Sequence, residues 1–169
     1  MRYFVESYGC TMNFGEGAML SRRMARLGHE PVASAEEADI VVLNTCTVVE
    51  TTERRMVERM GELRRAGKEV VVTGCMAKAQ PKRVSIRLPN ALVIAPEDYS
   101  SFDPVVEGRY GRGCSECMVP AESCGIIPIA QGCLGDCTYC ITKIARGRLR
   151  SRTEEEIIAD FEAMLASGS

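Results

Sequence analysis

Short apolar runs alternate with amphipathic segments through the first hundred or so residues of the chain. The apolar runs are almost continuously hydrophobic and rich in β-branched residues, which is typical of strands buried on both faces of a parallel sheet. The segments between them repeat apolar residues every three or four positions, as helices do. This alternation predicts an α/β fold with right-handed crossovers. The predicted strands are Tyr3–Val5, Ile40–Leu43, Val70–Val72 and Leu92–Ile94.

Helix starts and helix faces can be predicted from the same pattern. Asn13 with Glu16, and Ser34 with Glu37, are spaced like helix-start signals. A histidine, His29, follows a glycine at a predicted helix end, where we expect a capping or surface role. The buried faces of the two long predicted helices are Leu20, Met24 and Leu27, and then Met56, Met60 and Leu63.

The composition changes after residue 103, and this divides the chain into three predicted regions. Residues 1–103 form the α/β domain, and residues 104–125, which are rich in glycine and proline, form a cysteine-containing linker. Residues 126–169 begin a new unit with an apolar run, a cysteine-rich loop and a basic stretch. A last helix follows a capping-box pattern at Thr153 and Glu156, and its predicted buried stripe is Ile157, Phe161 and Met164. One strand and one helix cannot bury a core alone, so either this unit docks on the first domain or the sequence is a fragment of a longer chain, and we favour the fragment.

Charge and cysteine content narrow the possible functions. The 169 residues contain 21 Lys and Arg against 23 Asp and Glu, so any contact with nucleic acid must be local. No apolar run reaches the roughly 18 residues of a membrane span, and no signal-peptide core is present, which predicts a cytoplasmic protein without a membrane partner. Nine cysteines accompany a single histidine, and this balance favours a metal held by sulfur, either iron–sulfur or zinc.

Three cysteines, which we name the first cysteine group, share one context. Cys10, Cys46 and Cys75 each follow an apolar strand by a few residues and precede a predicted helix. Because the carboxyl ends of parallel strands lie along one edge of the sheet, where ligands bind, we expect the three thiols to meet there. Gly9 and Gly74 allow tight turns, and nearby helix starts would stabilise thiolates. The alternative is that the three are buried cysteines acting as small hydrophobic residues.

A second cysteine group, Cys133, Cys137 and Cys140, forms a C-x3-C-x2-C motif in one short loop. Three thiolates on a four-iron cluster leave one iron open, and an open metal position is what catalysis requires. Tyr139 precedes the last cysteine and could offer an aromatic face to a bound cofactor.

A zinc ribbon is the alternative for part of this loop. The pairs Cys114-x2-Cys117 and Cys137-x2-Cys140 are separated by 19 residues, which lies within the ribbon spacing. The ribbon leaves Cys133 and the first cysteine group without a role. On that interpretation the chain would be a non-catalytic zinc-ribbon or redox module. The linker cysteines Cys114, Cys117 and Cys124 otherwise have no assigned role.

The two cysteine groups and their surroundings resemble one family, the methylthiotransferases of the radical S-adenosylmethionine superfamily. The resemblance covers nearly the whole chain. The stretches that carry it are SYGCTMN at 7–13, NTCTV at 44–48, TGCMA at 73–77, PIAQGCLGDCTYC at 128–140 and ARG at 145–147.

The resemblance implies a fold, two cofactors and a reaction. The fold would be a parallel-sheet methylthiotransferase domain followed by the first βα unit of a radical S-adenosylmethionine (β/α) barrel. The first cysteine group would hold an auxiliary [4Fe–4S] cluster, and the second a [4Fe–4S] cluster that binds S-adenosylmethionine. The reaction would insert sulfur into a C–H bond and methylate it, with tRNA as substrate, a flavodoxin- or ferredoxin-like electron donor and a sulfur source. A barrel needs about two hundred residues, so this chain alone should be inactive.

The residues after Cys140 bear on the branch of the family. Bacterial branches that modify isopentenyladenosine or a ribosomal-protein aspartate usually have a proline two residues after this cysteine, whereas this chain has Thr142. Lys143 and the ARG stretch resemble the archaeal and eukaryotic branch, which methylthiolates N6-threonylcarbamoyladenosine beside the tRNA anticodon. The bacterial activities are the alternatives.

Five cations follow the second cysteine group within ten residues. They could contact phosphates of tRNA or of the active site. They could equally form a solvated surface that pairs with Glu154–Glu156. The five are Lys143, Arg146, Arg148, Arg150 and Arg152.

Overall fold

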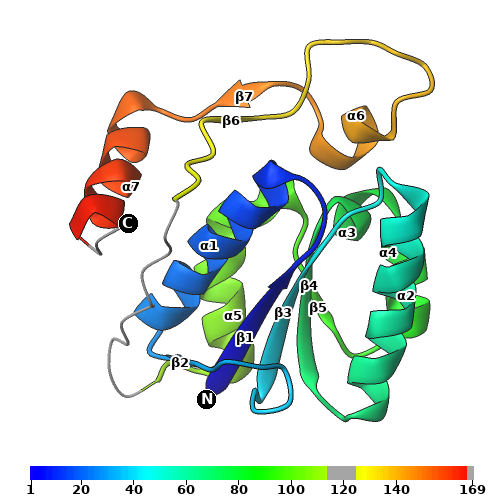
Figure 1. Ribbon diagram of the computed structural model, residues 1–169, viewed down its shortest axis with the longest axis vertical. Helices are drawn as coiled ribbons and strands as arrows, with labels where there is room; N and C mark the ends of the chain where they lie inside the picture. The colour runs from blue at the N-terminus through cyan, green and yellow to red at the C-terminus, as the bar shows by residue number, and fades with distance from the viewer. Residues whose placement is uncertain (114–124, 167–169) are drawn as a thin grey trace.

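The first part of the chain folds around a five-stranded parallel sheet (Figure 1). The structure is a computed structural model, and it describes residues 1–113 and 125–166. The strand order is β2-β1-β3-β4-β5, and the four predicted strands are confirmed, with the short edge strand β2 in addition. The strands are β1 (Arg2–Ser7), β2 (Glu30–Pro31), β3 (Ile40–Thr45), β4 (Glu69–Gly74) and β5 (Leu92–Val93).

Helices cover both faces of this sheet, as right-handed crossovers between parallel strands require. Helices α1 and α5 pack on one face, and α2 with α4 on the other (Figure 1). The short helix α3 begins where β4 ends. The bounds are α1 (Thr11–Arg26), α2 (Glu50–Arg65), α3 (Cys75–Ala79), α4 (Pro81–Arg87), the 3-10 helix η1 (Pro96–Ser101) and α5 (Phe102–Tyr110).

The central strand β3 divides the core into two layers. Its residues Val41 and Leu43 pack with the α2 side chains, and Ile40 and Val42 pack with those of α1 and α5. All four are fully buried, and burying each such side chain stabilises the fold by about 1.5–3 kcal/mol. The predicted apolar stripes of α1 and α2 are buried as expected. The predicted α/β class is therefore confirmed.

The first residues of the predicted linker, 104–110, belong to helix α5, which completes one helical layer. Phe102 and Val106 are fully buried against the sheet. Arg23 of α1 forms an ion pair of 2.6 Å with Asp103 and lies over the Phe102 ring. Pro104 is in the first turn of the helix, where its missing N–H costs little. Residues 104–110 of the predicted linker are therefore helical, and the division into domains remains a prediction.

The two predicted helix-start signals in this domain are also wrong. Helix α1 begins at Thr11, with Cys10 as its N-cap, so Asn13 and Glu16 lie inside the helix, where both are buried. Residues 34–37 form a bend and turn instead of a helix. Strand β3 begins only three residues later, which leaves no room for a helix.

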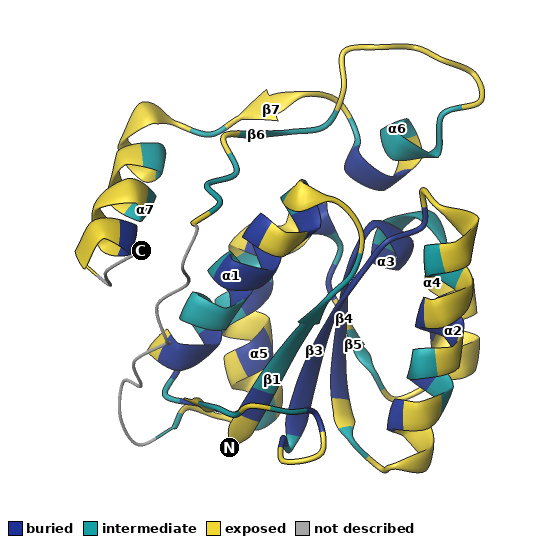
Figure 2. Cartoon of the chain, viewed as in Figure 1, coloured by how far each residue is buried: buried dark blue, intermediate teal, exposed yellow. Residues whose placement is uncertain are grey.

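The later part of the chain, residues 125–166, buries few side chains (Figure 2). Among these residues only Ala145, Arg146 and Met164 are buried. This is consistent with the expectation that one strand and one helix cannot form a core alone. Its elements are β6 (Ala130–Gln131), α6 (Ile141–Arg146), β7 (Arg150–Ser151) and α7 (Glu154–Ala166).

The start of α7 is confirmed, whereas its predicted buried stripe is not. The Thr153 hydroxyl accepts from the Glu156 N–H at 3.3 Å, and the Glu156 carboxylate accepts from the Thr153 N–H at 3.1 Å. On the predicted stripe Met164 is buried, but Ile157 is only half-buried and Phe161 is 52% exposed.

The apolar run at 126–129 is not a strand in this structure. Strand β6 begins at residue 130 and pairs antiparallel with β7. A barrel strand needs a parallel neighbour, and among the described residues no strand runs parallel to 126–129, whose only strand-like contact is the Arg152 N–H that donates to the Ile129 carbonyl at 3.0 Å. The expected first barrel strand therefore remains a prediction.

Across the two described ranges, no helix combines the length and apolar character that crossing a bilayer requires.

Gly74 ends β4 in a conformation that other residues avoid. Its φ is 82° and its ψ is −164°, a region essentially restricted to glycine. A Cβ atom there would lie 2.3 Å from the Thr45 carbonyl oxygen on β3. Glycine therefore fixes the turn that leads into Cys75.

We expect Gly74→Ala to lower the free energy of unfolding by about 3 kcal/mol or more, because backbone strain and a collision with β3 add together. Gly108→Ala in α5 is the matched control, since a Cβ there meets no atom of the described residues within 4 Å. The control should be neutral or gain up to about 1 kcal/mol from helix propensity. Urea unfolding followed by circular dichroism measures both, and equal effects of the two changes would contradict the argument.

His29 was expected to cap a helix or lie on the surface, and the structure corrects this. The side chain is 1% exposed, and neither ring nitrogen has a hydrogen-bond partner among the residues that the structure describes. Burial lowers the pKa of His29, and the N-terminal ammonium adds to the effect. The folded protein therefore favours the neutral imidazole.

This burial predicts an acid-dependent loss of stability. Because the pKa is lower in the folded chain, protonation favours the unfolded chain, and stability falls as the pH drops below the unfolded value of about 6.5. Relative to His29→Gln, the wild type should lose up to about 1.4 kcal/mol between pH 7.5 and 5.5. Urea unfolding at the two pH values measures this, and identical pH dependence of the two proteins would refute it.

Candidate metal centre

The first cysteine group converges on one pocket at the carboxyl edge of the sheet. Cys10, Cys46 and Cys75 follow β1, β3 and β4, and all three line a pocket of about 390 Å³. Cys46 and Cys75 are buried, whereas Cys10 is exposed. The predicted meeting of these three residues is therefore confirmed. Whether they bind a metal remains a prediction.

A close backbone approach brings Cys10 and Cys46 together. Gly9 has a φ of 119°, and a Cβ on it would lie 2.8 Å from the Cys46 Cβ and 3.0 Å from its sulfur. A side chain at position 9 would thus fill space that the Cys46 side chain occupies. Glycine at this position keeps the edge of the sheet open to the two cysteines.

Buried amides connect the loops that carry these cysteines. The Asn13 side chain donates to the Thr45 carbonyl at 3.0 Å, and the Asn44 side chain donates to the Asn13 carbonyl at 2.6 Å. The Cys10 thiol donates to the Asn13 side-chain oxygen at 3.4 Å. Since buried polar groups are costly unless paired, these bonds fix the loops after β1 and β3 relative to each other.

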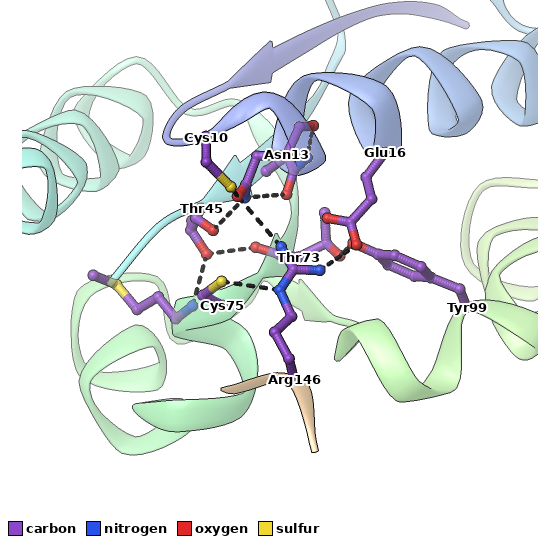
Figure 3. Close-up of polar contacts among 10 residues, drawn as sticks. Cys10, Asn13, Glu16, Thr45, Thr73, Cys75, Tyr99 and Arg146 are labelled. Atoms are coloured by element: carbon purple, nitrogen blue, oxygen red, sulfur yellow. Dashed lines mark hydrogen bonds and ion pairs between the residues drawn. The ribbon is translucent and has the colours of Figure 1, made fainter. Parts of the chain in front are cut away.

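A charged side chain from the later part of the chain enters the same site (Figure 3). The Arg146 Nε donates to the Cys75 sulfur at 3.1 Å, and its Nη1 forms an ion pair with Glu16. Its Nη2 donates to the Asn13 side-chain oxygen at 3.3 Å. The three nitrogens of one guanidinium thus reach three partners on α1 and α3.

Burial and this cation act in opposite directions on the acidic groups. Burial raises the pKa of the Cys75 thiol, whereas the Arg146 charge favours the thiolate. Burial likewise raises the pKa of the Glu16 carboxyl, and the hydrogen bond from Arg146 opposes it. Arg146 is thus the main stabiliser of negative charge at this end of the pocket.

The second cysteine group lies in a solvent-accessible loop above the pocket. Cys133 and Cys137 are exposed, and Cys140 caps the N-terminus of α6. The Cys133 sulfur accepts from the Gly135 N–H at 3.2 Å. The backbone N–H of Lys143 and the Thr142 hydroxyl lower the pKa of the Cys140 thiol, which favours its thiolate.

The residues that flank the second cysteine group reach the pocket of the first. Gln131 and Gly132, before the loop, and Thr142, after it, line the same pocket as the first cysteine group. Helix α6 packs against α3, which carries Cys75 (Figure 1). Tyr139, the predicted cofactor contact, is 89% exposed. The pocket is therefore lined by the three thiols of the first cysteine group together with residues that flank the second.

The five predicted phosphate contacts are in different environments. Arg146 is buried in the pocket wall, Lys143 pairs with Asp136, and Arg152 pairs with Asp160 at 2.7 Å. Arg148 and Arg150 are exposed and form no ion pair with other described residues. Arg148 and Arg150 are therefore accessible to phosphate groups at the surface, whereas Arg146 is buried.

Sequence reasoning missed several residues of the site. The pocket is also lined by Met12, Val48, Val49 and Thr52. Asn13 and Glu16 were interpreted as a helix start, yet they continue the buried stripe of Leu20 and Met24 toward the site. Polar residues on an otherwise apolar helix face were the signal that could have identified them.

The three thiols of the pocket are the type of ligand that holds an iron–sulfur cluster. Within residues 1–113 and 125–166 no three His, Cys, Asp or Glu side chains are placed to share one metal ion. A four-iron cluster needs wider spacing because each thiolate binds a different iron, and the pocket has three thiols around its wall. The linker cysteines Cys114, Cys117 and Cys124 lie outside the described residues.

Fold and site together define a doubly wound α/β protein with thiols at the carboxyl edge of its sheet. The chain belongs to the family described as "Uncharacterized protein family UPF0004", whose pattern matches residues 2–95. It is 36% identical over its whole length to a protein of Methanocaldococcus jannaschii, named "Probable threonylcarbamoyladenosine tRNA methylthiotransferase", and covers 42% of that protein.

Other relatives have related names. A Pyrococcus horikoshii protein with the same name is 34% identical over 94% of this chain and 40% of its own length. A Dictyoglomus thermophilum protein named "tRNA-2-methylthio-N(6)-dimethylallyladenosine synthase" is 30% identical over 99% of this chain and 43% of its own length. The chain thus spans about two fifths of the length of the curated relatives that it matches.

Proposed function

We propose that this chain is the cluster-bearing N-terminal part of a tRNA methylthiotransferase. The observation that carries the proposal is the pocket that the first cysteine group lines together with the flanks of the second. The names of the relatives support the enzyme class and tRNA as substrate. A tRNA substrate is also consistent with the cytoplasmic location that the sequence predicts.

Each cysteine group has a separate role in this proposal. Cys10, Cys46 and Cys75 would hold an auxiliary [4Fe–4S] cluster, and Cys133, Cys137 and Cys140 would hold the cluster that binds S-adenosylmethionine. When bound, the two clusters and S-adenosylmethionine supply the radical and sulfur chemistry that modifies an unactivated C–H bond. The exposed Tyr139 would lie against the cofactor, and an electron donor of the flavodoxin or ferredoxin kind and a sulfur source would be required.

The residues of this chain provide the environment for that chemistry. The burial of Cys46 and Cys75 excludes water from the inner side of the pocket. The exposed loop of Cys133 and Cys137 leaves their side of the site open to partners. Exposed Arg148 and Arg150 would contact the phosphates of the tRNA.

Metal content tests this assignment. After anaerobic reconstitution with iron and sulfide, we expect about eight irons per chain. Replacing Cys10, Cys46 and Cys75 by alanine should leave about four, and so should replacing Cys133, Cys137 and Cys140, because each set would hold one four-iron cluster. Iron and sulfide assays with electron paramagnetic resonance measure both outcomes.

The matched control replaces Cys114, Cys117 and Cys124 by alanine, which removes the same number of thiols and should leave about eight irons. One tightly held zinc without iron, lost on replacing Cys114 or Cys137, would contradict the proposal. That result would favour the zinc-ribbon module.

We further propose that the modified nucleoside is N6-threonylcarbamoyladenosine. Four relatives of that name are 31–36% identical to this chain, and four named for dimethylallyladenosine are 27–30% identical. The residues after Cys140 support the same branch. Isopentenyladenosine in tRNA and a ribosomal-protein aspartate are the alternative substrates.

Nucleoside analysis distinguishes these substrates. The complete reading frame that encodes this chain is expressed in a host whose tRNA contains both adenosine derivatives and which lacks its own methylthiotransferases. Mass spectrometry of digested tRNA should then show only the 2-methylthio derivative of N6-threonylcarbamoyladenosine. A frame carrying alanine at Cys133, Cys137 and Cys140 is the control, and accumulation of the isopentenyl derivative would refute this substrate.

A further inference from the structure

One ion pair differs from every other in the described residues by its burial. The side chains of Arg146 and Glu16 are 6% and 4% exposed, whereas the next most buried pair, Arg59 with Glu6, is 23% and 16% exposed. The pair joins residues 130 positions apart in the sequence. It therefore connects the segment that carries the second cysteine group to the helix that follows Cys10.

A contribution to the stability of the fold does not by itself explain why this ion pair is buried. Removing two charges from water is costly, and an apolar contact of similar volume commonly stabilises a fold as well or better. Burial of a cation here has one consequence that an apolar contact lacks, because the Arg146 Nε donates to the Cys75 sulfur at 3.1 Å. The charge thus acts on a thiol that our proposed function assigns to the auxiliary cluster.

The surrounding residues hold the guanidinium in one orientation. Glu16 accepts from Nη1, and the Asn13 side-chain oxygen accepts from Nη2, so the planar group cannot rotate away from Cys75 without losing both bonds. Helix α6, which ends at Arg146, packs against α3, which begins at Cys75. Figure 3 shows the guanidinium between α1 and the start of α3.

We infer that Arg146 is a positioning residue that docks the second cysteine group over the first and tunes the electron affinity of the cluster at Cys75. This inference rests on the proposed function. A cationic N–H donor to a ligating sulfur stabilises the extra negative charge of a reduced cluster, and so raises the reduction potential. The Glu16 carboxylate opposes this field and limits the rise.

We therefore expect substitutions of Arg146 and Glu16 to shift the reduction potential of the auxiliary cluster in opposite directions. In a full chain with alanine at Cys133, Cys137 and Cys140, only the auxiliary cluster remains. Arg146→Met should lower its reduction potential because the donor is lost, whereas Glu16→Gln should raise it because the cation is no longer neutralised. Anaerobic titration followed by electron paramagnetic resonance measures both. Exposed Arg148→Met is the matched control and should leave the potential unchanged.

If Arg146 and Glu16 only stabilised the fold, Arg146→Met and Glu16→Gln would not shift the reduction potential in opposite directions. Shifts of the same sign, or no shift in either variant, would overturn the tuning role. The double variant Glu16→Met/Arg146→Met guards against misfolding, since it leaves no unpaired buried charge. It should take up iron as the parent does and show a potential below the parent's.

Docking is tested on the metal-free chain, which keeps this inference distinct from the proposed function. By hydrogen exchange, Arg146→Met should reduce protection in α6 by about a hundredfold, because a buried charge loses its partner. Arg148→Met should leave α6 as in the wild type. Equal protection in the two variants would overturn the docking role. A parent that binds no iron would instead refute the proposed function, whatever the exchange result.

Discussion

The parallel direction of β1, β3 and β4 is the constraint on which the site depends. Strands that run the same way end at the same edge, and crossover helices return the chain to the opposite edge before each new strand. Cys10, Cys46 and Cys75 are far apart in the sequence, yet each follows its own strand end and reaches one pocket. The pocket is therefore a consequence of the sheet topology and of glycines that allow the turns.

Burying polar groups at the end of a packed core removes them from water, which is unfavourable, and internal hydrogen bonds offset this loss. Asn13, Asn44 and Thr45 are fully buried, and an unpaired polar group in that position would be strongly destabilising. The amides of Asn13 and Asn44 bond to backbone carbonyls of the facing loops. The same bonds that satisfy these groups also hold the cysteine loops in place, so stability and site geometry have one origin.

Secondary structure could be predicted from the sequence where the local hydrophobic pattern agrees with the burial in the folded chain. The four short apolar runs became strands because parallel strands that are buried on both faces need continuous hydrophobicity. Prediction failed where packing overrides local signals. Asn13 and Glu16 match a helix-start pattern, but only the packed structure shows that they face Arg146 from within α1. Residues 104–110 contain proline and glycine, yet burial of Val106 against the sheet outweighs their low helix propensity.

The two cysteine groups lie on parts of the chain that are packed to different degrees. This difference explains why a basic residue connects them. The first is fixed by the α/β core, whereas residues 125–166 bury only three side chains and cannot hold the second group rigidly by themselves. Two of those three, Ala145 and Arg146, are adjacent at the contact with the first domain. Lysine could not replace this arginine equivalently, because a single ammonium cannot reach a sulfur, a carboxylate and an amide oxygen in one plane. The fork geometry of the guanidinium thus links the relative position of the two groups to the charge at Cys75.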